Sequence, residues 1–202
     1  MKVTTTIRGF KRRRVHRQDL LGTEPLELPP SSFETTGVWL EIPDAIPAAL
    51  KAERRHVMGG IHAVEHAALG LFPLFALCDR LDVAGISHTH HPQLGSAAIF
   101  LYDGAPGGLG LVSSLFHRFE TLLEATLERI GDCECEEGCP ACIHSPRCGS
   151  GNRPLDKAAA VQALRLLLAL DPLPELPEAP AREGEEPPAP ETGDEAAGAP
   201  AP

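Results

Sequence analysis

The sequence has few aromatic residues and no long apolar run. Phe, Trp and Tyr make up 4% of its 202 residues, whereas apolar residues together make up 43%. We therefore expect a hydrophobic core built mainly from Leu, Ile, Val and Ala. No apolar run approaches the roughly 20 residues that a membrane-spanning helix needs, so no membrane contact is expected. The N-terminal stretch MKVTTTIRGFKRRRV also lacks the apolar segment of a secretory signal. These absences favour a cytoplasmic protein whose thiols stay reduced.

The motifs of a nucleotide-driven motor are absent as well. The sequence contains no G-x4-G-K-[ST] phosphate loop, no Gly-Lys pair and no DEAD or DEAH box. We therefore expect that this chain alone does not bind and hydrolyse ATP.

Charge is distributed unevenly along the chain. The net charge is -10, but residues 171–202 carry nine acidic side chains and one basic one, whereas the first 20 residues carry seven basic and one acidic. Lys and Arg dominate contacts to the DNA backbone, so the basic run is a candidate nucleic-acid-binding site. A solvated strand end, or a patch that binds the acidic tail, explains the run equally well. The candidate residues are Lys11, Arg12, Arg13 and Arg14.

Composition divides the chain into three expected segments. Residues 1–46 form a strand and loop segment with the basic patch, 47–170 form the folded module, and 171–202 form a tail. Nine of the 20 prolines lie between 172 and 202, amid Glu, Ala and Gly. Such a composition buries too little apolar surface to offset the entropy of ordering, so the tail is predicted to be disordered.

Apolar periodicity predicts an α+β fold, with a small mixed or antiparallel sheet and three main helices. Gly59-Gly60 and Pro73 are candidate breaks in the first helix, and residues 22–36 are expected to form a loop. Strands are expected over 3–15, 36–42, 82–86 and 97–102, and helices over 47–78, 109–130 and 155–170.

Five of the six cysteines lie within 16 residues, in the pattern C-x-C-x3-C-x2-C-x5-C. Four thiolates satisfy the tetrahedral preference of Zn²⁺ and leave no open position for water. The pattern therefore favours one structural zinc ion that joins the end of the second long helix to the start of the third. Disulfides, a redox-active C-x2-C pair and an iron–sulfur cluster are the alternatives. The expected ligands are Cys133, Cys135, Cys139 and Cys142, with Cys148 as a possible replacement for Cys133.

The cysteine block and three further stretches resemble the zinc-binding C-terminal module of MrfA-like DNA helicases. The block CECEEGCPACIHSPRCG begins at Cys133 and is followed by Asn152 and Leu155-Asp156-Lys157. The other stretches are TTGVW from Thr35, GIHAVEHA from Gly60 and YDGAPGGLG from Tyr102. The resemblance covers about residues 3–170.

This resemblance implies a role in a superfamily 2, DEAD/DEAH-type, ATP-dependent DNA helicase involved in DNA repair. In that family the module follows two motor domains and helps to shape the surface that holds DNA. The motor motifs are missing here, so helicase motor domains are expected either as a separate subunit or in a missing N-terminal part. The implied function is that of an accessory zinc module with DNA or partner contacts and no catalytic residue of its own.

A rival hypothesis comes from His62, Glu65 and His66, which fit the H-x-x-E-H pattern of one class of zinc metalloproteases. On a helix the two histidines lie one turn apart and Glu65 is a possible base. A third zinc ligand would have to come from elsewhere, for which Glu120, Glu124 and Glu128 are candidates. An internal polar network is the interpretation that we favour for these three residues. A zinc-stabilised protein–protein adaptor is the remaining alternative.

Overall fold

A three-stranded antiparallel sheet lies at the centre of the folded part of the chain, residues 35–174, which we call the body. The computed structural model describes residues 1–16 and 19–174 of the chain. The strand order is β5-β7-β6, with β7 in the middle. β7 reads AAIFLYD and is buried along almost its whole length, as expected for a central strand. The strands span Gly37–Ile42 (β5), Val83–His88 (β6) and Ala97–Asp103 (β7).

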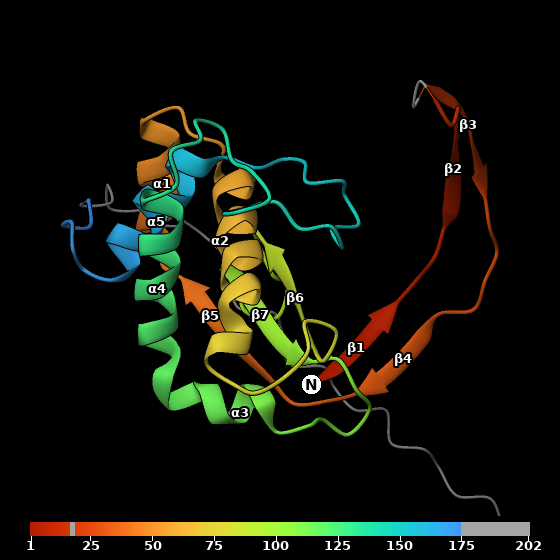
Figure 1. Cartoon of the computed structure of the whole chain (residues 1–202), viewed down its shortest axis with the longest axis horizontal. Helices are drawn as coiled ribbons and strands as arrows, with labels where there is room; N and C mark the ends of the chain where they lie inside the picture. The colour runs from red at the N-terminus through yellow and green to blue at the C-terminus, as the bar shows by residue number, and fades with distance from the viewer. Residues whose placement is uncertain (17–18, 175–202) are drawn as a thin grey trace, which may run out of the picture.

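Helices cover one face of this sheet. Figure 1 shows α2 in front of the sheet, with α4 and α5 beside it on the left. α2 packs against β6, α4 and α5, and every residue from Gly59 to Ala68 is buried. The helical segments span Ala45–Ala52 (α1), Val57–Leu71 (α2), Phe72–Leu74 (η1), Leu111–Leu115 (α3), Phe116–Arg118 (η2), Phe119–Gly131 (α4) and Lys157–Leu167 (α5).

α2 is the core helix of the body. The segment Val57–Leu74 is long and apolar enough to cross a membrane by length and composition alone, but 61% of it is buried inside the fold. Burial against a sheet and two helices accounts for this apolar character. The core around α2 includes Ile61, Val64, Phe72, Leu101 and Leu164, each at most 1% exposed.

The α+β fold class predicted from the sequence is confirmed, but one expected helix break is wrong. Gly59 and Gly60 lie inside α2, and a Cβ on Gly60 would meet the Cβ of Ala159 at 2.7 Å. These glycines allow α5 to approach α2 closely rather than interrupting the helix. The first predicted helix is instead interrupted at residues 53–56, where Arg54 has a φ of 58°, and η1 begins at Phe72, just before Pro73.

The N-terminal residues form an arm of two antiparallel ribbons, which we call the arm (residues 1–34). β1 (Lys2–Thr5) pairs with β4 (Ser31–Glu34), and β2 (Gly9–Arg13) pairs with β3 (Leu20–Pro25). Figure 1 shows the β2–β3 ribbon far from the helices. The prediction that residues 22–36 form a loop is therefore wrong, because part of that stretch pairs with the beginning of the chain.

The division into three segments stays a prediction. β5 lies before the expected boundary at residue 46 and is hydrogen-bonded to β7 in the central sheet. Most of the predicted disordered tail, residues 175–202, lies outside the described residues.

Candidate metal centre

The sulfur atoms of Cys133, Cys135, Cys139 and Cys142 lie together within 4.8 Å of one another. Four of their pairwise distances are between 3.5 and 3.7 Å. A tetrahedral site with Zn–S bonds of about 2.3 Å has edges of about 3.8 Å, whereas a disulfide requires a sulfur–sulfur distance of about 2.05 Å. The four thiols therefore fit one zinc ion and are not disulfide-bonded.

The chain between Cys139 and Cys142 is folded as a tight knuckle. The backbone N–H groups of Cys142, Ile143 and His144 all donate to the carbonyl oxygen of Cys139. The Cys139 N–H donates to the sulfur of Cys142 at 3.3 Å. Gly138 has a φ of 112°, and a Cβ there would meet the Ile143 side chain at 2.4 Å. This glycine is therefore required for the turn by which the chain enters the knuckle.

Two contacts connect the knuckle to the rest of the body. The side chain of Ile143 is fully buried in the core. The Lys157 ammonium, at the start of α5, donates to the carbonyl oxygens of Cys133 and Cys135, the second at 2.6 Å. Its positive charge lies beside a centre that carries a net charge of about -2 when four thiolates bind Zn²⁺. The knuckle thus connects the end of α4 to the beginning of α5.

The thiols have different affinities for protons. Burial raises the pKa of Cys142 to about 12. Hydrogen bonds, first of all from the Cys135 backbone, lower the pKa of Cys133 to about 7. A buried thiol with so high a pKa ionises at neutral pH only when a cation compensates its charge. A bound metal cation would stabilise the thiolate form of these side chains.

Cys148 does not join this tetrahedron. Its sulfur lies 3.4 Å from Nε2 of His62, and it forms a second group with His62 and His66. Within the part of the chain that the structure describes, neither group contains Glu120, Glu124 or Glu128. The third ligand expected for a hydrolase is therefore not supplied by the glutamates of α4.

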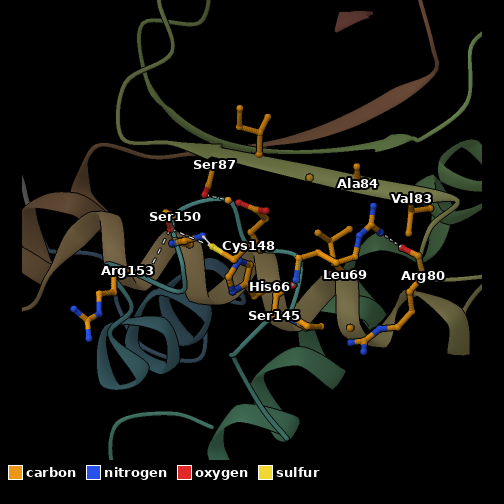
Figure 2. A pocket seen from close by; sticks show the side chains of 18 of the residues that line it. His66, Leu69, Arg80, Val83, Ala84, Ser87, Ser145, Cys148, Ser150 and Arg153 are labelled. Carbon is orange, nitrogen blue, oxygen red and sulfur yellow. Dashed lines mark hydrogen bonds between the residues drawn. The ribbon is translucent and has the colours of Figure 1, made fainter. Parts of the chain in front are cut away.

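The H-x-x-E-H residues face a cavity of about 600 Å³ between α2, β6 and the segment after the knuckle. Figure 2 shows Cys148 beside His66 near the middle of the residues that line this cavity, with Arg153 on one side of them and Arg80 on the other. Glu65 accepts a hydrogen bond from Ser87 at 2.5 Å, and burial raises its pKa. Burial also lowers the pKa of His66, which favours its neutral form.

The basic run lies in the arm. Lys11, Arg12 and Arg13 are on β2, Arg14 follows it, and all four are exposed. Arg12 forms an ion pair with Glu24 of the neighbouring strand at 3.0 Å. The assignment of these four basic residues to nucleic-acid binding stays a prediction. The assignment of the four cysteines as zinc ligands also stays a prediction.

Together, the fold and the four-thiol knuckle define a zinc-binding α+β module. The family model of the MrfA Zn-binding domain matches residues 64–143. An uncharacterized protein of Methanocaldococcus jannaschii is 38% identical over 112 residues, which are 54% of this chain and the whole of that protein. The chain belongs to the family of MrfA Zn-binding domains.

Larger relatives are helicases. The ATP-dependent helicase YprA of Bacillus subtilis is 34% identical over 66% of this chain, and the helicase hrq1 of Schizosaccharomyces pombe is 28% identical over 82%. The chain spans only 18% and 17% of these two proteins. The crystal structure of the DUF1998 helicase MrfA bound to DNA matches with a TM-score of 0.53 and 29% identity, over 81% of this chain and 21% of that one.

Proposed function

We propose that this chain is an accessory zinc module of an ATP-dependent DNA helicase and that it contributes DNA or partner contacts without an ATPase of its own. The observation that carries the proposal is the match to helicase MrfA in a DNA-bound structure, which extends over most of this chain but only about a fifth of that protein. The helicase relatives hold the matching segment within one long chain. The motor domains are therefore the expected partner, and a cytoplasmic location and a role in DNA repair belong to the same proposal.

The arm supports a contact role for the module. It carries exposed apolar side chains on the β2–β3 ribbon and on the segments that join this ribbon to β1 and β4, and exposed apolar groups of this kind favour a partner surface. It also carries the basic run of β2, which suits phosphate contacts. The exposed apolar residues are Ile7, Phe10, Val15, Leu20, Leu21, Leu26 and Leu28.

The DNA contact is tested by fluorescence anisotropy on single-stranded and duplex oligonucleotides over a range of salt concentrations. Phosphate contacts make the affinity fall with salt, with a logarithmic slope of about 0.9 per contact on duplex DNA. Replacing Lys11, Arg12, Arg13 and Arg14 by Ala should lower both the affinity and this slope. A control variant replaces three basic residues that are exposed on the body, Lys51, Arg55 and Arg129, and should leave the slope unchanged.

Two results would count against the proposal. An affinity that is indifferent to salt, or equal losses in both variants, would remove the arm from DNA binding and favour the protein–protein adaptor. DNA-stimulated ATP hydrolysis by the purified chain would contradict an accessory role without an ATPase.

A further inference from the structure

His62, His66 and Cys148 come from two segments that the fold brings together. The histidines lie one turn apart on α2 and are 8% and 7% exposed, and their ring centroids are 4.2 Å apart. Cys148 lies in the segment between the knuckle and α5. One ligand atom from each residue lies within 4.8 Å of the other two. The 3.4 Å between His62 Nε2 and the Cys148 sulfur is close to the edge of about 3.5 Å that a tetrahedral zinc site with one nitrogen and one sulfur ligand requires.

Both imidazole rings are oriented by backbone carbonyl groups. Nδ1 of His62 lies 2.9 Å from the carbonyl oxygen of Pro154, and Nδ1 of His66 lies 2.8 Å from that of Ile143. A carbonyl oxygen only accepts hydrogen bonds, so Nδ1 carries the proton in both rings. In the neutral ring, Nε2 then carries the lone pair that a metal ion needs, and in His62 this nitrogen is the one that faces the Cys148 sulfur. Histidine ligands of metals are commonly fixed in this way, with the other ring nitrogen donating to a carbonyl or a carboxylate.

The surroundings leave space for a fourth ligand. The cavity of about 600 Å³ is lined by both histidines and Cys148, and also by Arg80, Arg147 and Arg153. Figure 2 shows His66 and Cys148 directed toward this space. A site with three protein ligands and one open position holds water or an exchangeable ligand there. The arginines favour an anion.

We propose that His62, His66 and Cys148 form a second metal site, separate from the knuckle, which binds Zn²⁺ or a similar divalent transition metal and leaves one position open to the cavity. Two imidazoles and a thiolate select a borderline-soft cation over Mg²⁺ or Ca²⁺. The site accounts for the fifth cysteine of the cluster. The second site is also connected to the knuckle, because the carbonyl group that orients His66 is that of Ile143, the residue after Cys142.

The test is elemental analysis of the full chain, reconstituted with Zn²⁺ under reducing conditions and then desalted. The wild type should hold two zinc ions per chain, and Cys148→Ser should hold one while keeping its circular dichroism spectrum. Cys78→Ser is the matched control, since Cys78 is a free cysteine in neither metal group, and it should hold two. His62→Gln provides an independent variant and should also hold one.

Titration with Co²⁺ provides a second readout, because thiolate ligation gives an intense charge-transfer band. The wild type should show two spectroscopically distinct sites, and Cys148→Ser should lose the weaker set of bands. One zinc per wild-type chain would overturn the proposal. It would also be overturned by two zinc ions that persist in both Cys148→Ser and His62→Gln. None of these results bears on whether the module assists a helicase.

Discussion

The body and the arm are ordered by different forces. In the described part of the chain, no residue before Thr35 is buried, whereas the body encloses a continuous apolar core and the four-thiol knuckle. The ribbons of the arm are held mainly by strand pairing, and an isolated two-stranded ribbon is marginally stable in water. The body therefore provides most of the stability of the module, and the arm provides an exposed surface that adds little to this stability.

The largest effect is expected in the body, at the knuckle. Cys142→Ser should abolish zinc binding at this centre and the cooperative thermal transition of the body, because structural zinc contributes on the order of 10 kcal/mol of folding free energy in small zinc domains. Elemental analysis measures the loss of zinc, and circular dichroism during heating measures the loss of the thermal transition. Cys78→Ser is the control and should melt near the wild type. A Cys142→Ser protein that melts like the control would show that the core alone holds the body together.

A smaller effect is expected at Asp103, which is fully buried at the end of β7. Its carboxylate accepts hydrogen bonds from the backbone N–H groups of Leu109, Gly110 and Val112, at 2.6, 2.7 and 3.0 Å. Asp103→Ala leaves these donors without their acceptor and should lower the free energy of unfolding by about 3 kcal/mol. Chemical denaturation of the wild type and the variant measures this loss in the free energy of unfolding. Asp44→Ala is the control, because Asp44 precedes α1 without capping it; equal losses in the two variants would contradict this account of Asp103.

A still smaller effect is expected at Asp156, the residue that caps the N-terminus of α5. The carboxylate of Asp156 accepts from the N–H of Ala159 and from that of His56, each at 2.9 Å, so it connects the starts of α5 and α2. Asp156→Ala should cost about 1–2 kcal/mol of unfolding free energy, whereas Asp156→Asn should recover most of it. Denaturant midpoints of the two variants check this. Equal midpoints for Ala and Asn would show that the cap contributes nothing.

The smallest effect is expected in the arm. Phe10 lies on β2 and is 43% exposed, so Phe10→Ser should change the free energy of unfolding of the body by no more than about 0.5 kcal/mol. Phe72→Ala, at a fully buried position, should cost about 3–5 kcal/mol. Parallel denaturation curves compare the two. A loss at Phe10 as large as that at Phe72 would mean that the arm packs as part of the core.

The parts of this molecule that the sequence predicts well carry local signals. The C-x-C and C-x2-C spacings lie within ten residues, so the four-thiol group is visible without the fold. The pairing of β1 with β4 joins residues that are 26 to 32 positions apart, and no local pattern in residues 22–36 indicates it. Gly60 looks like a helix break until α5 is known to cross there. The place of Cys148 depends in the same way on the fold, which brings its segment against α2.

Amide hydrogen exchange, read by mass spectrometry before and after zinc is removed with a chelator under reducing conditions, tests the central claim most directly. The account predicts that α2, α4 and α5 lose protection together when zinc leaves, whereas the arm exchanges rapidly in both states. Protection of α4 and α5 that survives complete removal of zinc would contradict the claim that the knuckle holds the body together.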